Sequence, residues 1–290
     1  MDVVRVLTEL GGVTRYGTLV ELTSKRAVDK AIRDAAVIRA GRGVCTLPVV
    51  PEARVAAERV DGVVSHLSAA LLHGWKVKTP PRHPIVTVRR NRNPKDTCGI
   101  EVKYAHWEPG EACGRLTSAV RTVIDCARAL PFDEALAVAD SALRSGAVTR
   151  ELLHEAVDRS PRTGRAKARR VVREASRKAA NPFESVLRAI ALGVPGLVVV
   201  PQGEVGTIGH ADLTDARLQI AIEADSYDWH AIPEQFRYDV RRYTDMVRLG
   251  WTVVRFVWED VMHKQDYVRG VLAEVVKQRT EVEALRLLAA

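Results

Sequence analysis

Cysteine is scarce in this chain, and the four that occur, Cys45, Cys98, Cys113 and Cys126, form no C-x-x-C pair. Zinc ribbons and dithiol redox sites are built on such pairs, so the spacing speaks against both. Scattered thiols behind an N-terminus without a long apolar run indicate a reducing compartment, and we expect the cytoplasm. No stretch approaches the roughly 18 apolar residues of a membrane span, so we expect no membrane partner.

Acidic residues are outnumbered: 36 Asp and Glu stand against 44 Lys and Arg, which gives a net charge of +8. A basic surface attracts phosphate backbones, although an ordinary basic protein has the same excess. Aromatic residues make up 5% and apolar residues 47% of the 290 positions, as in a globular protein long enough for two domains. The composition therefore favours a folded protein with a polyanionic partner.

Residues 1–50 show helical spacing in "DVVRVLTEL", in "TRYGTLVEL" with Thr14 as N-cap, and in "TSKRAVDKAIRDAAVI" with Ser24 as N-cap. The segment "VIRAGRGVCTLP" then alternates around a basic turn, which predicts a hairpin. This order is typical of a winged helix-turn-helix, whose recognition helix enters the major groove while the wing contacts phosphates. The alternative is a solvated helix face beside a turn. The candidate DNA contacts are Arg26, Lys30 and Arg33 in the helix and Arg39 and Arg42 in the wing.

Residues 51–160 mix helical and strand patterns, and residues 161–180 form a basic, helix-compatible linker. His66 and His73 could share a helix face, but no third ligand is placed, so we interpret them as packing or surface residues. Asp125 and Asp140 fall within helical patterns broken at Pro131 and Gly146, and we interpret both as structural.

The N-terminal half resembles the AbiEi family of bacterial antitoxins. The similar stretches are "GGVTRYGTLVELTSKRAVDKAIRDAAVIRAGRGVCTLP", "GVVSHLSAALLHGW", "IVTVRR" and "AVRTVIDCARALPFDEALAVADSALRSGAVT". The resemblance implies a DNA-binding autoregulator with a winged-helix head on a supporting mixed α/β domain.

Residues 181–290 alternate between helical and strand patterns, which predicts an α/β/α sandwich around a central sheet. Asp212 lies in one strand of an expected hairpin, Glu223 ends the next, and Asp225 follows on the same side of the strand. Three carboxylates at one sheet edge repel one another unless a cation lies between them, and oxygen ligands suit Mg²⁺ or Mn²⁺. The predicted metal ligands are therefore Asp212, Glu223 and Asp225.

Such an ion would polarise a phosphoryl oxygen and lower the pKa of an attacking water, with no organic cofactor. His230 could act as base or proton shuttle, and Arg237, Arg241 and Arg242 could neutralise the cleaved backbone. Glu184 is a further candidate for catalysis. The run Asn181-Pro182-Phe183-Glu184 is equally a helix capping box, so both roles remain open for Glu184.

The C-terminal part resembles the PD-(D/E)XK nucleases, in the branch of the very-short-patch-repair (Vsr) endonucleases. The matching text is "NPFESVLRAI", "HADLTDARLQIAIEADSYDWH" and "FRYDVRRYTDMVRLGWTVVRFVWEDV". The resemblance implies that Asp212 is the central ligand, that Glu223 or Asp225 completes the site, and that Glu184 holds a second ion or a metal-bound water. Asp225 stands where the superfamily has lysine, so either His230 or an arginine takes over that role or the site is impaired.

The sequence thus predicts an N-terminal winged helix, a mixed α/β middle domain and a restriction-endonuclease-like sandwich. The function that follows is a Mg²⁺- or Mn²⁺-dependent endonuclease acting on double-stranded DNA. One alternative is a DNA-binding regulator or antitoxin whose nuclease-like domain is noncatalytic. Another is a repair nuclease that cuts only mismatched or modified DNA, and RNA also remains open as a substrate.

Overall fold

The computed structural model describes residues 2–41, 43–225 and 233–289. The chain forms two compact units. The first comprises Met1–Trp75, Thr79–Ala129 and Glu151–Arg165, and the second comprises Lys76–Lys78, Leu130–Arg150 and Ala166–Ala290. The expected boundaries at residues 160 and 180 do not coincide with this division, because residues 130–150 and 166–180 belong with the C-terminal sheet.

The N-terminal part of the first unit combines three helices with a three-stranded antiparallel sheet of order β1-β3-β2. All three helices contribute to the core of this part, with Leu7 from the first, Leu19 from the second and Val28 from the third. Ser24 caps the third helix as predicted, because its Oγ accepts the Ala27 N–H at 3.2 Å. The elements are α1 (Val3–Glu9), β1 (Val13–Arg15), α2 (Tyr16–Leu22), α3 (Lys25–Arg33), β2 (Ile38–Arg39) and β3 (Val44–Thr46).

The expected N-cap at Thr14 is wrong. Thr14 pairs with Cys45 in the β1–β3 ladder, and α2 begins two residues later at Tyr16. The N-cap of α2 is Arg15, the last residue of β1, so the helix follows the strand directly.

The rest of the first unit is built around a five-stranded sheet of order β6-β5-β4-β8-β7. A short helix, α5, follows β4, and Ser65 occupies its N-cap position. The elements are α4 (Glu52–Val60), β4 (Val63–Val64), α5 (His66–Leu72), β5 (Ile85–Val88), β6 (Glu101–Tyr104), β7 (Ala112–Cys113), β8 (Leu116–Thr117), α6 (Ala119–Ala129) and α8 (Arg150–Arg159).

His66 and His73 have packing roles in this unit. The His73 ring stacks on Trp75 with 4.8 Å between centroids, and its Nε2 lies 2.9 Å from the Thr117 carbonyl oxygen. His66 has a positive φ of 51°, and its Nδ1 lies 2.9 Å from Ser65 Oγ. Both imidazoles are held by protein groups, which agrees with the structural interpretation of the pair.

The pH dependence of stability offers a test of the environment of His66. Burial lowers the pKa of His66 below its ordinary value, whereas in the unfolded chain it is about 6.5. The stability that depends on neutral His66 is therefore present above about pH 6.5 and is lost as the pH falls below it. When the pH falls from 7.5 to 5.5, we expect the free energy of unfolding in urea to change less unfavourably in H66N than in the natural protein, because the variant has no imidazole to protonate. His154→Asn, at an exposed histidine, is the control, and the same pH dependence in both variants would contradict the prediction.

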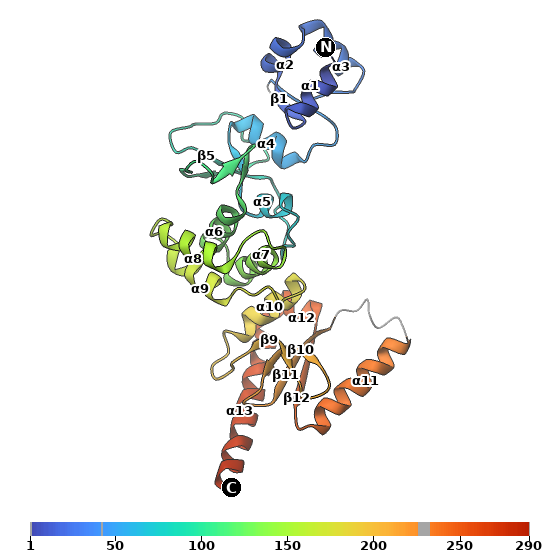
Figure 1. Ribbon diagram of the computed structural model, residues 1–290, viewed down its shortest axis with the longest axis vertical. Coiled ribbons are helices and arrows are strands. Elements are labelled where there is room, and N and C mark those ends of the chain that lie inside the picture. The colour runs from blue at the N-terminus through green and yellow to red at the C-terminus, as the bar shows by residue number, and fades with distance from the viewer. Residues whose placement is uncertain (1, 42, 226–232, 290) are drawn as a thin grey trace. The chain divides into compact units, whose positions relative to one another are not determined.

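The second unit is built on a four-stranded sheet of order β12-β11-β10-β9 (Figure 1). Strands β9 to β11 form an antiparallel meander, and β12 lies parallel to β11, so the chain crosses over through α11 between them. The elements are α7 (Phe132–Arg144), α9 (Arg165–Glu174), α10 (Pro182–Ala191), β9 (Val200–Glu204), β10 (His210–Asp215), β11 (Ile220–Asp225), α11 (Pro233–Arg248), β12 (Thr252–Val257), α12 (Trp258–His263) and α13 (Gln265–Ala289).

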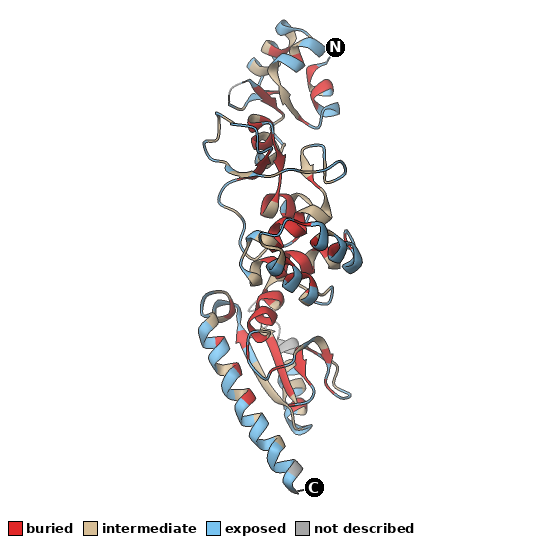
Figure 2. Ribbon diagram, turned by 90° about the vertical axis from the view of Figure 1, so that its left-hand side faces the viewer, coloured by how far each residue is buried: buried red, intermediate tan, exposed pale blue. Residues whose placement is uncertain are grey.

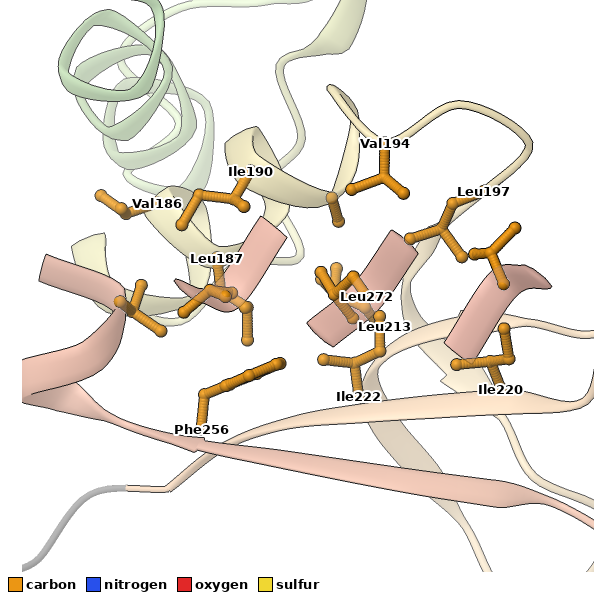
Figure 3. Packing of buried hydrophobic residues seen from close by; sticks show 14 of the residues in the cluster. Val186, Leu187, Ile190, Val194, Leu197, Leu213, Ile220, Ile222, Phe256 and Leu272 are labelled. Atoms are coloured by element: carbon orange, nitrogen blue, oxygen red, sulfur yellow. The ribbon is translucent and has the colours of Figure 1, made fainter. Parts of the chain in front are cut away.

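Helices cover both faces of this sheet. On one face, α10, α12 and α13 pack on the strands through a cluster that includes Leu187, Ile222 and Leu272 (Figure 3). On the other, Met246 of α11 packs with Ala211 and Ala221. Figure 2 shows how completely α10 is buried, while most of α13 is exposed. This is the three-layer arrangement expected for the C-terminal part.

A buried ion pair joins α7 to α10. The side chains of Asp140 and Arg188 are 1% and 4% exposed. Arg188 Nη2 contacts the two carboxylate oxygens at 2.7 and 2.6 Å. The Asp140 carboxylate also accepts the Ser185 hydroxyl at 2.8 Å and the Ser176 N–H at 2.7 Å. Asp140 is structural, as predicted.

Asp125 is structural in the same way, because Arg121 Nε lies 2.9 Å from each of its carboxylate oxygens.

None of the helices in the described part of the chain combines the length and the apolar character needed to cross a bilayer.

Candidate functional site

Asp212 and Glu223 come together on neighbouring strands. Leu213 of β10 pairs with Ile222 of β11, so the next step of this register places Asp212 opposite Glu223. Leu213 and Ile222 face the main core. Because side chains alternate along β11, Glu223 lies on the opposite face, toward α11, where Arg242 contacts it.

The carboxylate of Asp212 is built into the sheet. Its Oδ2 accepts the Ala224 N–H at 2.8 Å, and its Oδ1 accepts Gln202 Nε2 at 3.0 Å. Gln202 lies in the left-handed region, with φ of 48°. These bonds fix Asp212 where the β10–β11 ladder would otherwise continue.

Burial makes a charge on these acids unfavourable. It raises the pKa of Glu223 to about 7, and the charge of Asp212 adds to the increase. Burial also raises the pKa of Asp212. Two adjacent carboxyls in a poorly solvated place share protons or bind a cation, because two bare charges there repel each other.

Arg242 of α11 supplies that cation to Glu223. Its Nη2 lies 2.8 Å from Glu223 Oε1 and also donates to the His210 carbonyl. Arg242, one of the predicted DNA contacts, instead pairs with Glu223 in this structure, and its side chain is 15% exposed. Arg237 and Arg241, the other two predicted contacts on α11, are exposed.

Asp225 is occupied by different partners. Arg255 Nε lies 2.6 Å from its Oδ2, and the Tyr243 hydroxyl donates to its Oδ1 at 3.3 Å. Within the described residues, no three Asp, Glu, His or Cys side chains are grouped so that they could hold a metal ion. The expected trio therefore reduces to the pair Asp212 and Glu223, with Asp225 bound to Arg255. His230 lies outside the described residues.

Glu184 takes part in a cap at the start of α10, close to the predicted capping box, but its carboxylate accepts the N–H of the residue before the N-cap Asn181. Its N–H donates to Asn181 Oδ1 at 3.0 Å, and its Oε2 accepts the Ala180 N–H at 2.8 Å. Burial raises the pKa of Glu184 to about 7, and the charge of Asp212 contributes. Glu184 therefore caps α10 and lies within electrostatic reach of Asp212.

Glu184→Gln separates these two roles, because glutamine can cap a helix as glutamate does. We expect E184Q to unfold at nearly the same urea concentration as the natural protein. Asn181→Ala removes the N-cap and should cost about 1 kcal/mol. A loss of DNA cleavage in E184Q alone would assign the effect to its charge. A destabilisation of E184Q as large as that of N181A would show that the amide does not replace the carboxylate in the cap.

Gln202, Tyr243 and Arg255 also belong to the site, although the sequence patterns do not predict them. Arg255 gives a faint signal, since it is the one charged residue in the apolar run "TVVRFV". The parallel register places it beside Glu223 on β11. Gln202 and Tyr243 carry no comparable signal.

The predicted contacts of the N-terminal helix are at the surface. Arg26, Lys30 and Arg33 are exposed on α3, while Val28 of the same helix is buried. The Arg39 guanidinium lies 4.7 Å from the centre of the Tyr16 ring. Arg42 lies outside the described residues.

Comparison with known proteins does not assign an activity. No protein-family model matches the chain. Two uncharacterized proteins of Mycobacterium tuberculosis, MT2308 from strain CDC 1551 / Oshkosh and Rv2248 from strain ATCC 25618 / H37Rv, are each 33% identical over 154 residues. The match takes in 51% of this chain and 57% of each relative, so the chain spans little more than half the length of these relatives.

Among solved structures, the chain is similar to the RV2827C protein from Mycobacterium tuberculosis, with a TM-score of 0.38 and 13% identity. The match covers 64% of this chain and 78% of that one. A likeness of this strength supports no inference about function. The fold by itself defines a mixed α/β protein of two compact units.

Proposed function

We propose that this protein is a metal-dependent DNA endonuclease, with a winged-helix head in residues 1–50 and a Vsr-like PD-(D/E)XK domain in residues 181–290. The observation that carries the proposal is the placement of Asp212 opposite Glu223 on neighbouring strands, with both carboxylates poorly solvated. A cation beside a structural acid normally lowers the pKa of that acid. Burial and the charge of Asp212 outweigh Arg242 here and raise the pKa of Glu223 to about 7, and perturbed pKa values of this kind are common at functional sites.

The residues present fit a hard divalent ion. Mg²⁺ is commonly held by one or two carboxylates, with waters and substrate phosphates completing its shell. Asp212 and Glu223 would be those two ligands, and Asp225 is not needed. When bound, the ion would polarise a phosphoryl oxygen and lower the pKa of a nearby water. Its ligands must be deprotonated, so binding should strengthen as the pH rises through 7.

The other residues of the site have positioning roles in this proposal. Gln202 and the Ala224 N–H hold the Asp212 carboxylate in place. Arg242 offsets the charge of Glu223, and Arg255 holds Asp225. Arg237 and Arg241, exposed on α11, would contact the phosphates that flank the cleaved bond.

The three helices and the β2–β3 hairpin of residues 1–50 support the winged-helix part of the proposal. In that arrangement α3 is the recognition helix and β2–β3 is the wing. Arg26, Lys30 and Arg33 would then reach the groove, and Arg39 would lie at the backbone.

A second candidate is a DNA-binding regulator whose nuclease-like domain does not cut. The observation that favours it is the pairing of Glu223 with Arg242 and of Asp225 with Arg255. Arginines in these places can replace a metal ion permanently. This candidate predicts sequence-specific DNA binding that is the same with Mn²⁺ and with EDTA.

Incubation of the whole chain with supercoiled plasmid and with a mismatched duplex distinguishes these candidates. Each substrate is tested with Mg²⁺, Mn²⁺ or EDTA. Metal-dependent cutting of the plasmid supports the endonuclease, and cutting of the mismatched duplex alone identifies a repair nuclease. Binding of duplex DNA without cleavage of either substrate would overturn the endonuclease proposal in favour of the regulator.

A further inference from the structure

Helix α9 and the turn that follows it, residues 166–179, hold a surplus of positive charge in the second unit. Ala168, Val171 and Val172 are buried, which fixes the inner side of the helix. The opposite side carries exposed basic residues, and the segment contains one acid, Glu174. The exposed basic residues are Lys167, Arg169, Arg170, Arg173, Arg177 and Lys178.

Arginine side chains from α7, α8 and α10 hold the backbone of this segment through hydrogen bonds to its carbonyl groups. Arg150 donates to the carbonyls of Arg173 and Ala175, and Arg188 donates to that of Glu174. Arg144 donates to the Ala179 carbonyl at 2.8 Å. The carbonyls of Arg173, Glu174 and Ala175 lie at the C-terminal end of α9, where cations stabilise the negative end of the helix dipole. These arginines hold the backbone of the segment and are not its outer charges.

Two of the outer arginines have partners on the protein surface. Arg173 pairs with Glu174 at 2.8 Å, and the Arg170 guanidinium lies 3.8 Å from the centre of the Phe132 ring. Lys167, Arg177 and Lys178 are exposed, and none of these three forms an ion pair with a residue that the structure describes. The turn that carries Arg177 and Lys178 is held in place, because the Ser176 N–H donates to Asp140 at 2.7 Å.

We propose that Lys167, Arg177 and Lys178 form a second, sequence-independent contact for the phosphate backbone of duplex DNA, separate from the N-terminal helix. Cations on a backbone that is already held lose little freedom on binding, and a polyanion relieves their mutual repulsion. The described residues of this segment include no exposed large apolar side chain, whereas a membrane-binding helix would need an apolar face. The choice of DNA as the polyanion rests on the proposed function.

Salt dependence of binding measures this contact directly. Full-length protein is titrated into a fluorescent duplex of arbitrary sequence, in EDTA, at several salt concentrations, and anisotropy gives the binding constant. Each phosphate contact contributes about 0.9 to the slope of log K against log salt. We expect Lys167→Gln/Arg177→Gln/Lys178→Gln to reduce that slope by about 2 to 3.

The matched control is Lys264→Gln/Arg269→Gln/Lys277→Gln, which removes the same charge from exposed positions of α13 and of the residues before it. Thermal unfolding checks that both variants fold. Equal slopes in the two triple variants would overturn the proposal, as would a natural protein whose binding does not depend on salt. The same titrations are made with single-stranded RNA. If the Lys167/Arg177/Lys178 variant bound RNA more weakly than the natural protein but bound duplex DNA equally well, the choice of DNA as the partner would be overturned. Because EDTA removes metal ions, a failure of the endonuclease proposal would leave this slope unchanged.

Discussion

Asp140→Ala is expected to lower the free energy of unfolding by about 3–5 kcal/mol, because it leaves the Arg188 guanidinium buried without its counterion. Arg188 is 4% exposed, so water cannot replace the lost carboxylate. The Ser185 hydroxyl and the Ser176 N–H would lose the same acceptor. Urea denaturation followed by circular dichroism measures the effect, and a change below about 1 kcal/mol would contradict the buried pair, since that is the range of surface ion pairs.

Removing both members of the pair should be much milder. Asp140→Leu combined with Arg188→Met leaves no isolated charge, and a buried ion pair exchanged for apolar residues is often neutral or stabilising. Arg188 Nε lacks a hydrogen-bond partner among the described residues, so the arginine already carries a desolvation cost. We expect the double variant to be more stable than Asp140→Ala. The single variants Asp140→Leu and Arg188→Met are measured beside it. A loss of stability in the double variant equal to the sum of the two single losses would show that the pair contributes mainly through its shape.

The second large effect is expected at Asp212. Asp212→Asn should reduce metal-dependent DNA cleavage by about a thousandfold or more, equivalent to about 4 kcal/mol of activation free energy. The same change should stabilise the metal-free protein, because it removes a charge that is poorly solvated and lies beside Glu223. Cleavage rates and urea denaturation in EDTA measure the two effects on the same preparations.

Asp245→Asn is the matched control, since it removes a carboxylate from α11 that pairs with Arg248 at the surface. It should leave cleavage unchanged and shift stability by no more than about 0.5 kcal/mol. Undiminished cleavage in Asp212→Asn would eliminate this residue as a metal ligand. Reduced cleavage together with reduced stability would indicate that the carboxylate is needed for folding.

Local patterns were sufficient to predict most elements of the second unit. The alternation in "ADLTD" and "IAIEAD" predicts β10 and β11, and the run Asn181 to Glu184 predicts the start of α10. These signals lie within a few neighbouring residues. The six-residue α12 was not predicted, because a helix this short depends on tertiary packing of Val261 and not on propensity.

The partners of the site could not be predicted in the same way. Arg242 lies 19 positions from Glu223, and only the packing of α11 on the sheet decides which of its arginines turns inward. Thr14 was misassigned for a related reason, since its strand partner Cys45 is remote in sequence. Contacts of this kind depend on tertiary structure, and the periodicity of apolar residues in the sequence carries no information about them.

The crossover between β11 and β12 has a consequence for the protein during its synthesis. The hairpin that carries Asp212 and Glu223 leaves the ribosome before α11 and β12, which carry Arg242 and Arg255. Until those segments are synthesised, the acids of the hairpin lack their counterions. The apolar face of the hairpin also stays exposed, because Phe256 and α13 are needed to cover it. Helix α11, strand β12 and helix α13 therefore complete both the charge balance and the burial of this sheet, so a chain truncated before residue 242 would carry an open, acidic hairpin.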